Sequence, residues 1–171
     1  ALEIKYIGIK SLQANLYQSF SNLILYLNNE RKDREEYIKN IHHSQEDLWP
    51  FGISGDLPIV LLVIDKDEDM NILRQVVNMH YYWKVLGLKS DLIIYNEEAS
   101  SYEEPIQNSI ITYLKNSLQK DNLNKNGGVF IHNKSTMNEE ILNFLKRIAS
   151  LYINSNNGAL MEQFTKNMED R

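Results

Sequence analysis

The chain has 171 residues, of which 43% are hydrophobic and 24% charged, values that are ordinary for one globular domain. Its net charge of −5, with no basic cluster on a predicted face, argues against nucleic acid or an anionic membrane surface as a partner. The absence of cysteine excludes disulfides and thiolate chemistry, and no apolar run is long enough for direct membrane insertion.

Residues 1–47 are predicted to form a helical lead-in. Apolar residues recur there at spacings of three and four, which places them on one helix face: Leu12, Leu16, Phe20, Leu23 and Leu27. The densely charged segment 30–39 is typical of a short solvated helix. The chain begins at Ala1 without an initiator methionine, so we expect it to be a piece of a longer protein.

The stretch 48–65 combines a compact loop with an apolar run. Residues 57–64 are apolar without interruption and rich in β-branched side chains, which indicates a strand covered on both faces. We therefore expect this strand to be central in a sheet, with Val60 and Leu62 buried.

The remaining sequence alternates helical and extended patterns. A helix capped by Asp67 is predicted to end at Gly87, and a strand follows at about 92–96. A capping box of Ser101 and Glu104 predicts the next helix, and a third strand is expected at about 128–132.

After the third strand, a capping box of Thr136 and Glu139 opens a last long helix that carries its apolar stripe through Tyr152. A turn at 154–158 and a short terminal helix at 159–168 complete the predicted elements.

This alternation predicts an α/β fold with a small three-stranded parallel sheet flanked by helices on both faces. The whole chain, 1–171, is expected to be one domain, in which 48–171 forms a β-α-β-α-β-α unit behind the lead-in.

Polar side chains follow the predicted strands, where open parallel sheets tend to bind ligands. Asp65, Asn96, Glu97 and His132 occupy these positions and form the candidate binding site. The simpler interpretation is that acidic and amide residues there cap helices and form turns, and we favour it. No metal site and no cofactor is expected: the acidic residues after the first strand would repel a nucleotide phosphate, and a calcium loop lacks its turn glycine and its final glutamate.

The loop 48–56 has two interpretations. Trp49 and Phe51 flank a proline and precede two glycines, which predicts a rigid corner with both rings buried, partly against neighbouring domains. Alternatively the loop is a ligand site, in which Trp49 stacks on a sugar and Asp56 provides a hydrogen bond.

Several runs resemble a segment of the very large bacterial cyclic β-1,2-glucan synthetases. The resemblance is carried by 48–61, 73–75, 80–83, 87–88, 91–97, 100–102 and 127–130. It implies a parent enzyme that makes cyclic β-1,2-glucan from UDP-glucose and has a C-terminal part similar to family thirty-six glycosyltransferases and glucan phosphorylases.

Within such a parent, the chain looks like a connecting α/β domain, because nothing in it matches the helical barrel that holds the phosphorylase's catalytic acid. The resemblance thus implies no catalytic residue here, neighbouring domains and possibly β-glucan as partners, and a cytoplasmic position with the parent anchored in the inner membrane. The alternative is a carbohydrate- or small-ligand-binding module that uses the carboxyl ends of the strands.

Overall fold

The computed structural model describes residues 44–98, 103–160, 162 and 163 of the chain. Residues 1–43 of the lead-in predicted at 1–47, the residue Ser101 of one predicted capping box and most of the predicted terminal helix lie outside these residues. The described elements are, in chain order, η1 (Gln45–Phe51), β1 (Ile59–Ile64), η2 (Asp67–Asp69), α3 (Met70–Val85), β2 (Asp91–Asn96), α4 (Pro105–Lys115), η3 (Lys120–Asn122), β3 (Val129–Asn133), α5 (Glu139–Ile148), β4 (Leu151–Asn154) and η4 (Ser155–Asn157).

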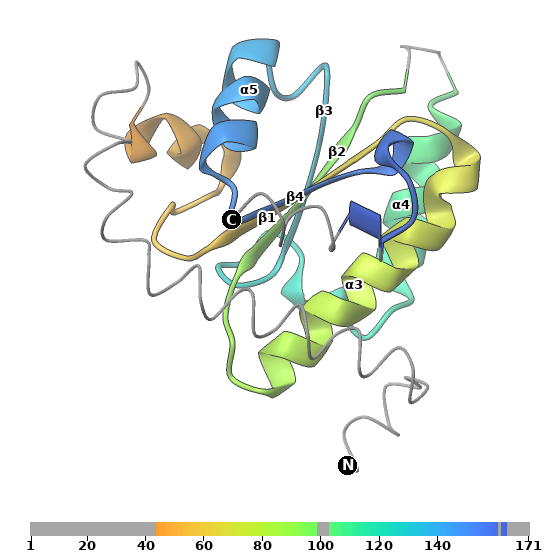
Figure 1. Cartoon of the computed structure of the whole chain (residues 1–171), viewed down its shortest axis with the longest axis horizontal. Helices are drawn as coiled ribbons and strands as arrows, with labels where there is room; N and C mark the ends of the chain where they lie inside the picture. Colours follow the sequence, from red (N-terminus) through yellow and green to blue (C-terminus); the bar gives the residue numbers. More distant parts are fainter. Residues whose placement is uncertain (1–43, 99–102, 161, 164–171) are drawn as a thin grey trace.

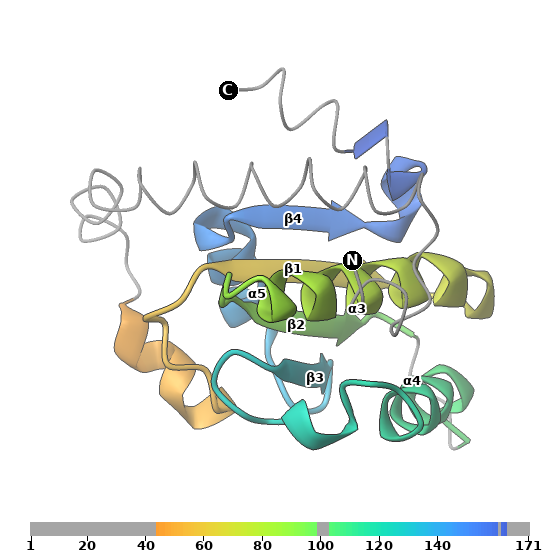
Figure 2. The ribbon, with the colours of Figure 1, turned by 90° about the horizontal axis from the view of Figure 1, so that it is seen from below.

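The four strands form one parallel sheet in the order β3-β2-β1-β4 (Figure 2). Val60 of β1 is in register with Leu92 of β2 on one side and with Leu151 of β4 on the other. β1 is therefore central, as predicted, and Val60 and Leu62 are both fully buried.

The sheet has four strands rather than the predicted three. Leu151 and Tyr152, expected to belong to the last helix, lie instead in β4, and α5 ends at Ile148. Leu151 and Ile153 are buried while Tyr152 and Asn154 are only partly covered, which is the alternation of a strand. In this conformation the segment pairs with β1, and Leu151 and Ile153 join the core on one face of the sheet.

Alternate residues of β1 point to opposite faces of the sheet, and each face has its own core. Val60, Leu62 and Ile64 pack with α3 and α4, whereas Ile59, Leu61 and Val63 pack with η1 and α5. Figure 1 shows this arrangement, with α5 and η1 on one side of the sheet and α3 and α4 on the other. Helices on both faces agree with the prediction from the sequence.

The helix ends agree with the sequence in part. Gly87 ends α3 as predicted: its positive φ lets the N–H of Leu88 reach the carbonyl oxygen of Trp83 at 2.8 Å. At the start of α5, however, Asn138 is the capping residue and accepts from the N–H of Ile141 at 2.9 Å. The predicted Thr136 cap is wrong, because the Thr136 hydroxyl bonds back to Asn133.

Among the helices of the described residues, none combines the length and the apolar composition that a membrane crossing requires.

Candidate functional site

The carboxyl ends of the four parallel strands lie along one edge of the sheet. In open parallel sheets, ligands bind beyond the carboxyl ends of the strands at the topological switch point. This is the place where the connections from two neighbouring strands lead to opposite sides of the sheet. Here strands are added from β1 through β2 to β3, and β4 then returns to the other side of β1. The expected position for a ligand is therefore between the ends of β1 and β4.

Side chains from η4 close this position by hydrogen bonding to the residues that follow β1. Asn156 Nδ2 donates to Asp65 Oδ2 at 2.9 Å, and Ser155 Oγ donates to Asp69 Oδ2 at 2.7 Å. Asp69 also accepts from the main-chain N–H groups of Asp65 and Lys66. Burial opposes ionisation of Asp69, but these hydrogen bonds outweigh it and lower the pKa of the carboxyl. The acidic residues at the end of β1 thus hold the connection to α3 and tie it to η4.

One atom of this cluster is left over. Asp65 Oδ1 is buried and has no hydrogen-bond partner among the described residues. Burying a carboxylate oxygen without a hydrogen-bond partner costs desolvation free energy. A ligand that donates a hydrogen bond to Asp65 Oδ1 would recover this free energy.

The residues after β2 have internal partners as well. The Asn96 side chain donates to Gln107 Oε1 at 3.2 Å and accepts from the N–H of Glu98 at 2.9 Å. Glu98 in turn accepts from the N–H of Ile106 in the first turn of α4, where a carboxylate is favoured by the helix dipole. The main-chain N–H of Glu97 donates to Ile64 at 2.7 Å and extends the pairing of β1 with β2.

His132, on β3, is bound between η1 and the turn before α5. Its Nε2 donates to the carbonyl oxygen of Phe51 at 3.1 Å, since a carbonyl can only accept, and its Nδ1 lies 3.1 Å from the Thr136 hydroxyl. The Phe51 ring meets the imidazole edge to face at 5.6 Å. Burial lowers the pKa of His132, so the ring is held neutral and fixed in place.

Trp49 and Asp56 do not join these four residues. Both lie around Ser54, whose carbonyl oxygen accepts from Trp49 Nε1 at 3.2 Å and from Gln45 Nε2 at 2.7 Å. Gln45 also donates to Asp56 Oδ1 at 2.6 Å. The Ser54 hydroxyl donates to Asn126, which precedes β3, so this loop reaches the amino end of that strand.

The predicted burial of the loop's aromatic residues is wrong for Trp49 within this chain. Trp49 is 58% exposed, Phe51 is half-buried, and Leu48 fills the core position instead. The segment forms the 3-10 helix η1 with Pro50 inside it, and this helix directs Leu48 inward and Trp49 outward. Whether a neighbouring domain covers Trp49 stays a prediction.

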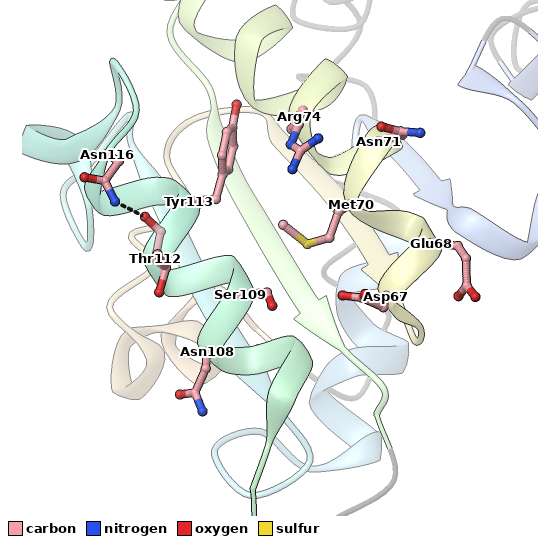
Figure 3. A pocket seen from close by; sticks show the side chains of 10 residues that line it. All are labelled: Asp67, Glu68, Met70, Asn71, Arg74, Asn108, Ser109, Thr112, Tyr113 and Asn116. Carbon is pink, nitrogen blue, oxygen red and sulfur yellow. Dashed lines mark hydrogen bonds between the residues drawn. The ribbon is translucent and has the colours of Figure 1, made fainter.

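A groove that the sequence did not predict lies between α3 and α4 (Figure 3). Its volume is about 660 Å³, and it is lined by Asp67, Glu68, Met70, Asn71, Arg74, Asn108, Ser109, Thr112, Tyr113 and Asn116. Each helix read alone shows these residues as a solvated polar face. The feature of the sequence that could have indicated the groove is the presence of Arg74 and Tyr113 on two successive helices, each next to apolar positions.

Within the described residues, no group of three or more histidine, aspartate or glutamate side chains is arranged to hold a metal ion. The acidic groups at the carboxyl edge are instead engaged with N–H and hydroxyl donors, as described above.

No protein-family model matches the chain. Among curated proteins, it is 27% identical over 166 residues to the cyclic beta-(1,2)-glucan synthase NdvB of Rhizobium meliloti (strain 1021). The similarity covers 96% of this chain but only 6% of that protein, so the chain corresponds to a small segment of its relative.

Proposed function

We propose that the chain is a non-catalytic connecting domain of a cyclic β-1,2-glucan synthase, a glycosyltransferase that uses UDP-glucose. The observation that carries this proposal is the similarity along 96% of the chain to one segment of a glucan synthase. In this proposal the chemistry is done by other parts of the parent, which is anchored in the bacterial inner membrane with this domain on the cytoplasmic side.

The hydrogen bonding at the carboxyl edge supports a structural role. Asn96, Glu98 and Asp69 all engage main-chain N–H groups that would otherwise lack partners, so their side chains serve the fold. A general acid or base needs an atom that can donate or accept a proton within reach of a substrate, and these side-chain atoms are instead bonded to the protein's own main chain.

Neighbouring domains of the parent are the proposed partners. Four large apolar side chains of the described residues are exposed, Trp49, Val85, Leu86 and Leu118. Trp49 is the largest of them, and its indole is already oriented by Ser54, so covering it would bury apolar area with little loss of side-chain freedom.

The catalytic question can be tested in the intact parent protein by isosteric substitutions at the edge. Asp65→Asn keeps an oxygen for Asn156, and His132→Gln keeps a side-chain amide in place of the imidazole. We expect both variants to accumulate normally and to make cyclic glucan at the parent's rate. Loss of glucan synthesis at a normal protein level would place one of these groups in the chemistry and refute the proposal.

A second test uses the purified chain. It is incubated with UDP-glucose and, separately, with β-1,2-glucan and inorganic phosphate. We expect neither glucosyl transfer nor release of glucose 1-phosphate, and either product would contradict a non-catalytic role.

The alternative, a ligand-binding module at the carboxyl ends of the strands, is favoured by one observation, the buried Asp65 Oδ1 without a partner in the described part of the chain. It requires that Asp65→Asn weaken ligand binding while leaving the fold intact.

A further inference from the structure

The groove between α3 and α4 is a surface feature that the structural role leaves unused. It begins at Asp67 and Glu68 of η2 and runs between the two helices to Asn116 at the end of α4. Figure 3 shows Met70, Arg74 and Asp67 directed from the α3 side toward Ser109 and Tyr113 of α4. The walls therefore come from two helices that a shared core holds in place.

The floor of the groove is apolar and its rim is polar. Met70 and Tyr113 are half-buried and pack against the core, while Arg74 lies over the Tyr113 ring, 5.8 Å from its centroid. Burial raises the pKa of Tyr113, although Arg74 opposes this, so the phenol stays protonated at neutral pH and can both donate and accept.

The rim offers paired donors and acceptors. Arg74 supplies only donors, Asp67 only acceptors, and the side chains of Ser109 and Asn71 supply both. This mixture suits a ligand that presents neighbouring hydroxyl groups, each of which donates and accepts. The apolar floor suits the C–H faces of the same ligand.

Other ligand classes fit less well. The two carboxylates against one arginine disfavour a phosphorylated ligand, because a doubly charged anion would meet Asp67 and Glu68. A purely apolar ligand would leave the rim groups without partners.

We propose that this groove binds a neutral oligosaccharide, a short segment of β-1,2-linked glucan. The choice of sugar rests on the proposed function, whereas the choice of a neutral polyhydroxylated ligand rests on the groove alone. The site would retain the parent's polymer beside a catalytic centre that lies elsewhere.

The experiment is a titration of the ¹⁵N-labelled full chain with a β-1,2-linked glucose oligosaccharide, followed by amide NMR. We expect shifts concentrated at residues of α3 and α4 that line the groove. Arg74→Ala and Tyr113→Ala should each weaken binding by about five-fold or more, the effect of losing one hydrogen bond. Ser109→Tyr, which fills the groove from a half-buried helix position, should abolish it.

The opposite face of the sheet provides a matched control. There Lys146 lies over the Tyr152 ring at 5.7 Å, an equivalent cation–aromatic pair outside the groove. Lys146→Ala and Tyr152→Ala should leave the affinity unchanged within about two-fold, which is below the effect of one hydrogen bond. Thermal unfolding of every variant identifies any that do not fold.

Four results would overturn the proposal, and three of them come from the sugar titration. They are no shift at millimolar sugar, shifts centred on Asn96 and His132 in place of the groove, or equal effects of the control substitutions. A fourth is that inorganic phosphate competes for the groove, since this would indicate an anion site. None of these outcomes tests the proposed non-catalytic role. That role is tested separately by the activity of the Asp65→Asn and His132→Gln variants of the parent.

Discussion

Nε2 of His80 lies 2.7 Å from the carbonyl oxygen of Ser90, and this contact joins the middle of α3 to the residue before β2. Because the carbonyl accepts, Nε2 carries a proton. Gln119 Nε2 lies 2.8 Å from Nδ1 and donates to it, so the imidazole is neutral and both its nitrogens are engaged. His80 is thus a buried histidine whose ring nitrogens are both hydrogen-bonded.

This geometry predicts how stability depends on pH. Burial lowers the pKa of His80 to about 4, with Lys84 adding to the effect and the Ser90 contact opposing it. Between about pH 6.5 and 4 the unfolded chain therefore binds a proton that the folded chain does not, so stability falls as the pH is lowered through this window. The contribution of this one group is about 3 kcal/mol.

The measurement is chemical denaturation from pH 7.5 to 4.5, together with an NMR titration of the imidazole. The slope of unfolding free energy against pH should decrease in His80→Gln, which cannot take up the proton. A His80 resonance that titrates near pH 6.5 in the folded chain would contradict the prediction.

Val60→Asp should unfold the domain. Val60 is fully buried between β2 and β4, so the carboxylate would lose water without gaining a partner, a cost of several kcal/mol or a forced protonation. Circular dichroism should show loss of cooperative unfolding. Asn143→Asp, on the exposed side of α5, introduces the same side chain and should leave the melting temperature within a few degrees.

The two neighbours Leu48 and Trp49 should respond in opposite ways to truncation. Leu48 is fully buried, and Leu48→Ala should cost about 2–5 kcal/mol of unfolding free energy. Trp49 is exposed, so Trp49→Ala should cost less than about 1 kcal/mol, mainly the hydrogen bond to Ser54. Urea unfolding of both variants measures the difference. A larger loss for Trp49→Ala would restore the interpretation of the loop as a corner held by its tryptophan.

Gly128→Ala should be more destabilising than Gly87→Ala. A Cβ atom at Gly128 would collide with the main-chain oxygen of Asn122, and the loop is held there by the bond from Gly128 N to Lys125 O at 2.8 Å. Relieving the collision requires a backbone shift, which typically costs about 1–3 kcal/mol, and so close an approach to a main-chain oxygen places the cost at the upper end of that range.

Gly87 is the control because a Cβ atom there meets open space. Only its positive φ opposes a side chain, at a cost of about 1–2 kcal/mol. Equal midpoints of thermal unfolding for the two alanine variants would refute the collision.

The parallel arrangement could be predicted from the sequence because β1 is a continuous apolar run. A run of this kind is typical of a strand that is buried on both faces of a parallel sheet. The prediction failed at β4 because Leu145, Ile148 and Tyr152 continue the spacing of α5, and only Ala149 and Ser150 separate the helix from the strand. Neither residue is a strong helix breaker, so local propensity could not locate the boundary and pairing with β1 decided it.

For the candidate site, the positions of the residues could be predicted from the sequence, but their hydrogen-bond partners could not. The position of Asp65, Asn96 and His132 along one edge follows from parallel strands, but their hydrogen-bond partners come from as far away as Asn156, 91 residues after Asp65. The groove depends on how α3 and α4 lie beside each other, which no pattern within either helix contains.

The return of β4 to the far side of β1 has a consequence for synthesis on the ribosome. β1, β2 and β3 follow one another in the chain, whereas the pairing of Val60 with Leu151 joins distant residues and forms only after residue 151 has emerged. Until then one side of the most apolar strand has open N–H and C=O groups. Such an edge recruits strands from other nascent chains. A chain released early, before residue 151, should therefore aggregate, whereas the loss of residues beyond β4 should not expose this edge.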